Sequence, residues 1–251
     1  MRWSKISTFY IKNEQKIDRK IFIEGSDVNH IRNVLRYKID DELNVCDETG
    51  VRYFTKITNF LEDKIELEIL SETEESTEMP IEVDLYQGLP KSDKMDLIVQ
   101  KCTEIGVSKV IPVLTDRVIV KLDDKSAAKK VERWNKIAIE ASKQSGRQKI
   151  SSVDNVTFLE NIIEKLSKYD IVIVPYECEK TSTLKAKLKN INKEIKSIAV
   201  VIGPEGGFSE NDIEILERCP SVEKVSLGKR ILRTETAGIA TLAMILYEYE
   251  L

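Results

Sequence analysis

The chain has 251 residues, of which 41% are hydrophobic and 33% are charged, with 39 lysines and arginines against 43 acids. This length fits one large or two modest domains, and the hydrophobic share is sufficient for a buried core. The sequence has no apolar run long enough for a membrane span, no amino-terminal secretion signal and no Cys-x-x-Cys pair, which argues against membrane, exported and disulfide-rich proteins.

The composition also disfavours metal and imidazole chemistry. His30 is the only histidine, and the cysteines at 46, 102, 178 and 219 are far apart. Neither the ligand spacing of a zinc site nor the residues of a histidine-activated nucleophile are present. We therefore expect four reduced thiols, no bound metal and a cytoplasmic protein.

Residues 1–72 are predicted to form a small β-barrel. A helix over 28–36 is expected after a cap at Ser26 or Asp27. Strands are expected at 7–11, 20–24, 43–46, 51–57 and 64–70. Residues 1–40 carry nine Lys and Arg against five Asp and Glu, so a basic face is compatible with the net charge of −4.

Residues 73–251 are predicted to form an α/β domain with a mostly parallel sheet. The polar stretch 71–78 has no periodicity and is typical of a linker. Strands are expected at 83–87, 109–114, 170–175, 198–202 and 225–227. Helices are expected at 93–105, 126–145, 157–166, 183–188, 234–247 and between Ser209 and Pro220. This alternation is typical of a parallel sheet with helices on both faces.

Two unusual loops follow the last two predicted strands. The first is Gly203-Pro204-Glu205-Gly206-Gly207-Phe208, and the second is Gly228-Lys229-Arg230-Ile231-Leu232-Arg233. Neither is a Rossmann fingerprint or a P-loop, so a nucleoside triphosphate is poorly supported. Three glycines in the first loop allow close approach of the main chain to a flat ligand such as adenine, or only a tight turn, and its shape alone leaves both open.

The segments 201–207 and 227–237 are similar to the two signature segments of the RsmE family. Members of that family are knotted (SPOUT-type) methyltransferases that methylate N3 of one uridine in 16S ribosomal RNA. The resemblance implies a PUA-like RNA-binding barrel over 1–72 and a SPOUT domain with a trefoil knot over 73–251. It also implies a homodimer that acts on the small ribosomal subunit or its RNA.

The resemblance further implies that S-adenosyl-L-methionine is held by three loops. The residues expected to bind this cofactor are Pro175, Tyr176, Glu177, Ile202, Gly203, Pro204, Glu205, Gly206, Gly207, Leu227, Gly228, Ile231, Leu232, Thr236 and Ala237. Because the sulfonium methyl group is already activated, the enzyme needs only to align uridine N3 and stabilise the base anion. Arg147 and Arg233 are the expected catalytic cations, with Glu235 as a base or as a partner that orients Arg233.

The RNA side of the predicted site rests on further similarities. Glu140–Arg147 resembles a Glu-Gln-Ser-Gly-Arg segment of the family, with Lys143 in place of the Glu, and Thr115–Arg117 resembles a Thr-Glu-Arg segment. The residues expected to bind RNA are His30, Arg32, Arg36, Arg117, Lys143, Gln144 and Arg147. A plain helix end at Gly146 and a surface ion pair are the alternative interpretations of this stretch.

Two other functions stay open on the sequence. One is a SPOUT relative that methylates another position, such as a ribose 2′-hydroxyl, which only the site of methylation would distinguish. The other is a non-catalytic RNA-binding protein of ribosome assembly, which fits the barrel and the basic amino end. Tight binding of S-adenosylmethionine would count against this second alternative.

Overall fold

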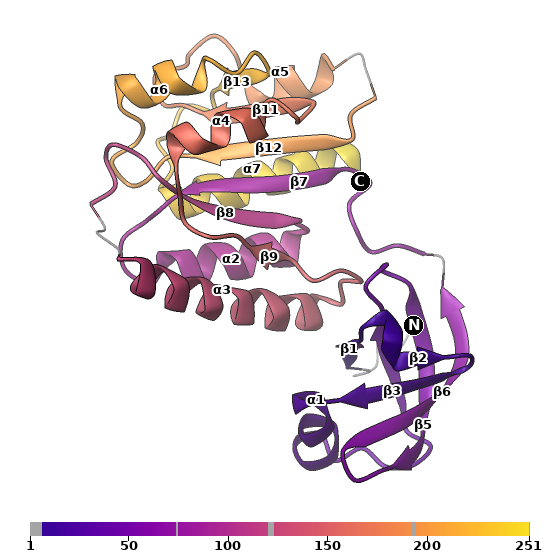
Figure 1. Cartoon of the computed structure of the whole chain (residues 1–251). Coiled ribbons are helices and arrows are strands. Elements are labelled where there is room, and N and C mark those ends of the chain that lie inside the picture. The colour runs from indigo at the N-terminus through magenta and orange to yellow at the C-terminus, as the bar shows by residue number, and fades with distance from the viewer. Residues whose placement is uncertain (1–6, 74, 120–122, 192–193, 251) are drawn as a thin grey trace. The chain divides into compact units, whose positions relative to one another are not determined.

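The computed structural model describes residues 7–73, 75–119, 123–191 and 194–250 (Figure 1). The chain divides into two compact units. We call Met1–Glu78 together with Ser142–Lys149 the barrel unit, and Met79–Ala141 together with Ile150–Leu251 the sheet unit. Each unit has its own hydrophobic core.

The barrel unit is built on a six-stranded mixed sheet. Its strands are β1 (Thr8–Tyr10), β2 (Lys16–Ile17), β3 (Lys20–Glu24), β4 (Glu42–Cys46), β5 (Arg52–Phe60) and β6 (Lys64–Thr73), in the order β1-β4-β5-β6-β3-β2. Only the β1–β4 pair is parallel among these neighbours. The predicted alternation along β6 is confirmed, because Ile65 and Leu67 are fully buried while Glu66 and Glu68 are not.

The helical segment of the barrel unit begins two residues earlier than predicted. It consists of α1 (Ser26–Asn29) and a π-helical turn, η2 (His30–Val34), while η1 (Asn13–Gln15) is a separate 3-10 turn. The predicted cap at Ser26 or Asp27 is wrong. Gly25 precedes the helix at φ 71°, and no side chain caps it. A glycine reaches this left-handed conformation without steric cost, so backbone geometry starts the helix here.

The sheet unit contains a parallel sheet of seven strands. They are β7 (Glu82–Gly88), β8 (Lys109–Leu114), β9 (Ser152–Val153), β10 (Thr157–Phe158), β11 (Ile171–Pro175), β12 (Ser197–Ile202) and β13 (Val222–Val225), in the order β10-β8-β7-β12-β11-β13, with β9 also pairing with β8. Every pair is parallel, which confirms the predicted sheet. The last strand lies three residues earlier than expected, because Val222 and Val225 pair with β11.

Helices cover both faces of this sheet (Figure 1). They are α2 (Lys94–Ile105), α3 (Asp124–Ser145), η3 (Leu159–Ile162), α4 (Ile163–Leu166), α5 (Leu184–Lys189), α6 (Glu210–Leu216) and α7 (Thr234–Tyr249). One core cluster joins the sheet to α2, α3, α5 and α7, and the other joins it to η3, α4 and α6. The last turn of α3, from Ser142, belongs to the barrel unit.

Local signals at the helix ends were partly correct. The capping box of α6 is present, with Ser209 accepting from the Asp212 N–H, and Gly106 ends α2 at φ 119°. The predicted helix over 157–166 is wrong in its first part. Thr157 and Phe158 instead form β10, which pairs with Val113 and Leu114 of β8. A two-residue strand is specified by its neighbour in space, so its own sequence carries no period that could reveal it.

Candidate functional site

The carboxyl ends of β11 and β13 enclose a hollow of about 150 Å³. The Tyr176 N–H donates to the carbonyl of Val225 at 3.0 Å, which joins the loop after β11 to the end of β13. Ligands in parallel sheets bind at this end of the strands. The residues that line the hollow are Pro175, Tyr176, Glu177, Ser226, Leu227, Gly228, Lys229, Arg230, Ile231, Leu232 and Ala237. Two of the three predicted cofactor loops therefore meet in one place.

The third predicted loop, 203–207, abuts this hollow through Glu177. Gly207 has φ 68°, and a Cβ atom there would lie 2.6 Å from the Glu177 Oε1 atom. The Gly207 N–H donates to the Pro204 carbonyl at 2.9 Å, which closes the turn. The backbone therefore favours a glycine at 207, and any larger residue would also displace the Glu177 carboxylate.

Some predicted cofactor residues do not line the hollow. Ile202 is buried at the end of β12, and Thr236 is exposed on the first turn of α7. Conversely, Ser226, Lys229 and Arg230 line the hollow although they were not among the predicted residues. They lie within or next to the segment 227–237, and this position in the sequence could have indicated them.

The predicted catalytic pair Arg233 and Glu235 lies at the start of α7. Arg233 is exposed and occupies the position before the first helical residue. Glu235 is largely buried and its Oε2 atom lies 3.5 Å from the Lys94 Nζ atom. Lys94 also pairs with Glu205 at 3.0 Å. The structure thus places Glu235 in an ion pair with a lysine that was not among the predicted site residues.

Arg117 is the predicted RNA-binding residue that lies beside the glycine loops. Its Nη1 donates to the Gly206 carbonyl at 2.8 Å. Its neighbour Asp116 accepts from the Ser209 hydroxyl at 2.7 Å and from Asn211 at 3.0 Å, which fixes the segment against the start of α6. These hydrogen bonds hold the pKa of Asp116 below its ordinary value.

The other predicted RNA-binding residues lie in the barrel unit. His30, Arg36 and Gln144 are exposed. Arg32 donates to the Leu61 carbonyl at 2.6 Å, and Lys143 pairs with Asp27 at 3.0 Å. The segment from α1 through η2 to Arg36 and the last turn of α3 therefore contribute polar side chains to one unit.

Arg147 is held inside the barrel unit. Its side chain is 6% exposed and forms an ion pair with Glu78. The Glu78 carboxylate also accepts from the Gln148 N–H at 2.9 Å and the Lys149 N–H at 3.1 Å. Burial alone would raise the pKa of Glu78, but Arg147 and these N–H groups hold it below its ordinary value. The predicted catalytic and RNA-binding roles of Arg147 stay predictions, and either would require its guanidinium to leave this pair.

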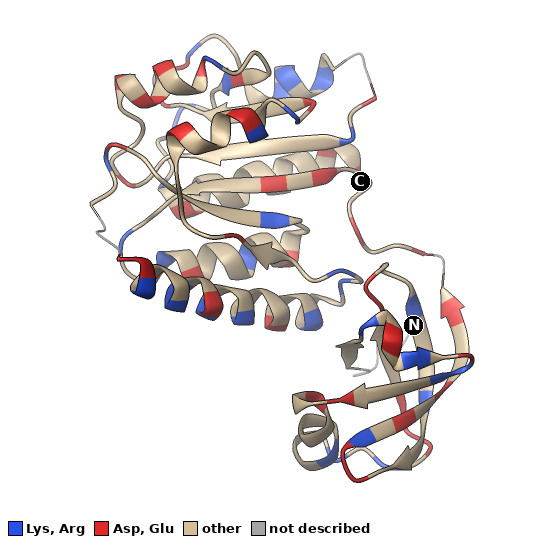
Figure 2. Cartoon of the chain, in the orientation of Figure 1, with Lys and Arg blue, Asp and Glu red and all other residues tan. Residues whose placement is uncertain are grey.

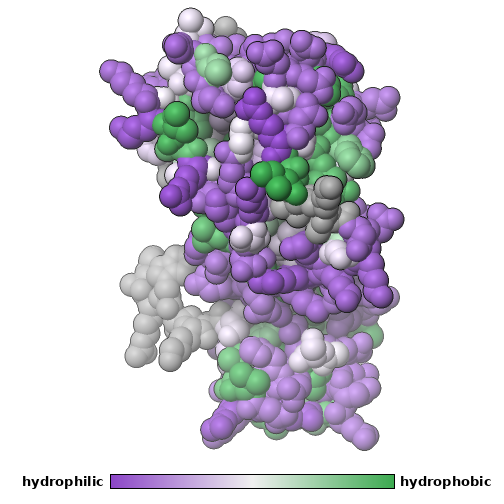
Figure 3. All heavy atoms as spheres, turned by 90° about the vertical axis from the view of Figure 1, so that its left-hand side faces the viewer, coloured by the Kyte–Doolittle hydropathy of each residue, from purple (hydrophilic) through white to green (hydrophobic). Residues whose placement is uncertain are grey.

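Charges of both signs lie along α3 (Figure 2). Arg133 pairs with Asp96, and Lys136 pairs with Glu132 at 2.7 Å. In contrast, Lys229, Arg230 and Arg233 are all exposed on the segment that lines the hollow. The view in Figure 3 shows a mostly hydrophilic surface with scattered apolar residues. Three exposed cations therefore lie on the segment 229–233, in or directly after the lining of the hollow.

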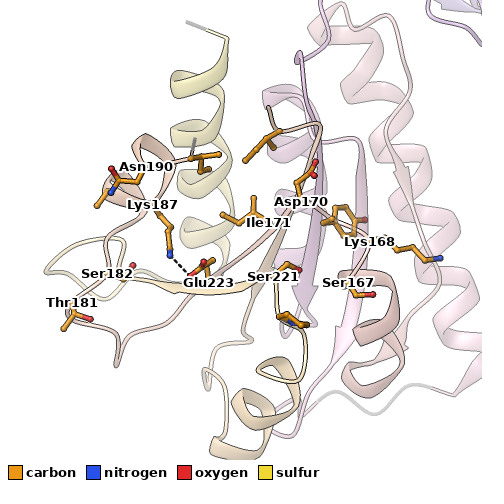
Figure 4. Close-up of a pocket in the computed structure, with 15 residues that line it drawn as sticks. Ser167, Lys168, Asp170, Ile171, Thr181, Ser182, Lys187, Asn190, Ser221 and Glu223 are labelled. Carbon is orange, nitrogen blue, oxygen red and sulfur yellow. Dashed lines mark ion pairs between the residues drawn. The ribbon is translucent and has the colours of Figure 1, made fainter. Parts of the chain in front are cut away.

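A larger hollow, of about 970 Å³, lies at the other end of β11 (Figure 4). It is lined by Ile171, at the amino end of that strand, and by residues of α5 and β13. Lys187 and Glu223 form an ion pair there at 2.7 Å. We assign the smaller hollow as the candidate site, because the predicted loops and the carboxyl strand ends converge on it.

The structure shows neither a metal cluster nor a membrane span in the residues it describes. Within the described ranges, no three His, Cys, Asp or Glu side chains are grouped so that they could hold a metal ion. Among the described helices, none is long and apolar enough to cross a membrane.

Comparison with known proteins gives consistent matches over both units. The RNA methyltransferase domain model matches residues 77–246, and the RNA methyltransferase PUA domain model matches residues 23–70. Ribosomal RNA small subunit methyltransferase E of Bacillus subtilis is 38% identical over 233 residues, which cover 91% of this chain and 90% of the relative. The enzyme of the same name from Aquifex aeolicus is 32% identical, with coverage of 93% and 97%.

A solved structure supports the same match. Ribosomal RNA small subunit methyltransferase E of Neisseria gonorrhoeae, bound to S-adenosyl methionine, superposes with a TM-score of 0.83 at 28% identity. The alignment covers 97% of this chain and 98% of that one. With the barrel and the parallel sheet described above, these matches confirm the predicted fold class of a PUA-like domain followed by an α/β methyltransferase domain.

Proposed function

This chain belongs to the ribosomal RNA small subunit methyltransferase E family, and we propose that it methylates N3 of one uridine in 16S ribosomal RNA, with S-adenosyl-L-methionine as the methyl donor. The observation that carries this proposal is the hollow at the carboxyl ends of β11 and β13, where the loops expected to hold the donor meet. Main-chain groups around Gly228 can approach a flat nucleoside closely there, and the 203–207 loop adjoins the hollow through Glu177.

The donor would be bound by the residues that line this hollow, with the 203–207 loop at its rim beside Glu177. Leu227, Leu232 and Ala237 supply apolar surface for a ring, and Gly228, at φ 122°, lets the chain bend between them. When bound, the donor supplies a methyl group on a positively charged sulfur. The residues predicted from the sequence to bind it remain our proposed set, extended by Ser226, Lys229 and Arg230.

Uridine N3 reacts only after its proton passes to a base, which is one of the two roles proposed for Glu235, and the negative charge left on the uracil must then be stabilised. Arg233 is exposed at the start of α7, next to the segment that lines the hollow, and can place a guanidinium against the base oxygens. Arg117, anchored on Gly206, is positioned to meet the base or a neighbouring phosphate. The target base has to leave its stack to reach this hollow.

The role of Arg233 is tested by the variant Arg233→Ala. We expect methyl transfer to 16S RNA to fall by about a hundredfold, because loss of one preorganised charge donor typically has this effect. Arg218→Ala, which removes an exposed arginine just after α6, is the control and should retain the wild-type rate. Equal rates in the two variants would remove Arg233 from the mechanism. Mass mapping of the RNA product identifies the methylated atom.

We also propose that residues 1–72 bind RNA while residues 73–251 carry out methyl transfer. His30 and Arg36 are exposed within residues 1–72 and available to RNA. The double variant His30→Ala/Arg36→Ala should weaken RNA binding in a gel-shift assay and leave the affinity for S-adenosylmethionine unchanged. A variant with normal RNA affinity would contradict this division of labour.

A homodimer is the proposed assembly. Helix α7 buries Leu242 and Ile245 but leaves Met244 43% and Tyr247 70% exposed. Apolar side chains that remain exposed on a packed helix can be covered by a second copy. Light scattering should give twice the chain mass, and Tyr247→Asp should shift the equilibrium toward the monomer. A wild-type monomer at micromolar concentration would exclude this assembly.

The knot and the cellular location are proposed on the same family membership. A knot would shorten the extended length measured when single molecules are pulled by their ends. A cytoplasmic location follows from the proposed substrate, and cell fractionation tests it.

A further inference from the structure

The connection from β7 to α2, residues Gln87 to Lys94, contacts parts of the candidate site that are far away in the sequence. Gln87 is fully buried at the end of β7. Its Nε2 donates to the Thr234 hydroxyl at 2.8 Å and to the Gly88 carbonyl at 3.0 Å. A side chain of β7 thus reaches the first residue of α7.

Thr234 extends this contact to the 203–207 loop. Its hydroxyl donates to the Gly203 carbonyl at 2.6 Å. A continuous chain of hydrogen bonds therefore runs from Gln87 through Thr234 to Gly203. Because Thr234 is itself buried, water cannot replace these bonds without a local opening of the structure.

A second, ionic link joins the β7–α2 connection, the 203–207 loop and the start of α7. Lys94, the first residue of α2, pairs with Glu205 of the glycine loop at 3.0 Å and with Glu235 of α7 at 3.5 Å. The Lys91 N–H donates to Glu205 at 3.0 Å. The hydrogen bond to Glu205 raises the pKa of Lys94, so the lysine is charged at any physiological pH.

We propose that Gln87, Thr234 and Lys94 form a latch that fixes the 203–207 loop and the start of α7 in the arrangement that binds S-adenosylmethionine. The latch rests on the proposed function, and its members are positioning residues. A loop with three glycines loses much conformational entropy when it is ordered. Contacts that order the loop before binding remove this cost from the affinity for the ligand.

The two links of the latch differ in chemistry, which makes them separable by experiment. The Gln87–Thr234–Gly203 link is neutral and buried, so added salt should leave it unchanged. The Lys94 side chain is about one-third exposed, so its pairs with Glu205 and Glu235 should weaken as ionic strength rises. Loss of either link should loosen the loop, and loss of both should have the larger effect.

The buried link is tested by Thr234→Val, which removes the hydroxyl and keeps the shape. Thr241→Val is the matched control, because Thr241 is also buried on α7 but its hydroxyl donates within the helix, to the Ala237 carbonyl at 2.8 Å. In calorimetry we expect Thr234→Val to raise the Kd for S-adenosylmethionine about tenfold, as loss of buried hydrogen bonds would. The control should stay within twofold of wild type in both Kd and kcat, and a Thr234→Val variant with the wild-type Kd would contradict the buried link.

The ionic link is tested by Lys94→Met, with Lys101→Met as its control. Lys101 lies on the same helix and pairs with Glu104 at 2.9 Å, away from both glycine loops. We expect Lys94→Met to raise the Kd about threefold at low salt and less at high salt, and Lys94→Arg to restore part of the loss. Lys101→Met should bind like wild type.

Amide hydrogen exchange separates failure of the latch from failure of the proposed function. Thr234→Val and Lys94→Met should accelerate exchange at Gly206 and Gly207 in the protein without donor, whereas the controls should not. Wild-type exchange at these amides together with wild-type Kd values would overturn the latch. A wild-type chain that binds no S-adenosylmethionine would overturn the proposed function, and the exchange rates would then decide the latch alone.

Discussion

The 203–207 loop in the sheet unit and the 142–149 segment in the barrel unit were both expected to serve the same active site, yet their surroundings differ. The first adjoins, through Glu177, a hollow that is lined by Gly228 and by the exposed Lys229 and Arg230. In the second, Arg147 is buried against Glu78, and Gln148 donates to the Glu75 carbonyl at 2.9 Å. A family motif therefore locates a residue, whereas its contacts determine whether the side chain is available to a ligand.

Within the 142–149 segment, the difference in burial between two cations predicts different losses of stability on mutation. Arg147→Met should lower the free energy of unfolding by about 3 kcal/mol or more, because it leaves the Glu78 carboxylate buried without its cation. Lys143→Met, which breaks a pair with Asp27 in which each side chain is 22% exposed, should cost less, about 1 kcal/mol. Urea unfolding measures both. Similar values for the two variants would mean that Arg147 is as available for RNA as Lys143.

Each of the two regions contains a glycine with a positive φ angle, so the same substitution can be compared in both. Gly207 has φ 68° and Gly146 has φ 71°, so an alanine at either costs about 1–2 kcal/mol in the left-handed region. Only the alanine at 207 meets a neighbour, the Glu177 carboxylate, whereas nothing lies within 4 Å of the Cβ position at 146.

We therefore expect Gly207→Ala to weaken binding of S-adenosylmethionine about tenfold. Gly146→Ala should lose stability without losing affinity for the donor. Calorimetric titration and thermal unfolding of both variants give the two quantities. Equal donor affinities would show that a side chain at 207 can be accommodated beside Glu177 without disturbing the hollow.

The smallest expected effect is a pH dependence in the barrel unit. The folded-state pKa of Glu78 lies below its ordinary value of 4.5, so its contribution to stability is complete above pH 4.5. This contribution is lost as the pH falls through the lower, folded-state pKa. The unfolding free energy of wild type should therefore fall more steeply below pH 4.5 than that of Glu78→Gln, as urea titrations at several pH values would reveal. If the unfolding free energies of wild type and Glu78→Gln fell equally with pH, Glu78 would not contribute to the loss of stability in acid.

Much of the architecture was readable from local sequence. The apolar run at 198–202 became β12, and the small-residue segment from Thr234 became α7. The glycine-bearing segments were recognisable from their glycines. Gly207 and Gly228 indeed have positive φ values, which other residues rarely adopt. These features depend on a residue and its near neighbours, so the sequence alone could indicate them.

Tertiary structure decided which distant segments became neighbours. Strand β7 pairs with both β8 and β12, and this order brings Gln87 to Thr234 and Lys94 to Glu205. It is long-range packing, too, that put Glu78 against Arg147, across a sequence separation of 69 residues. Periodicity reports which face of an element is buried, but the partner of a polar side chain is set by strand order and long-range packing, which one sequence does not encode locally.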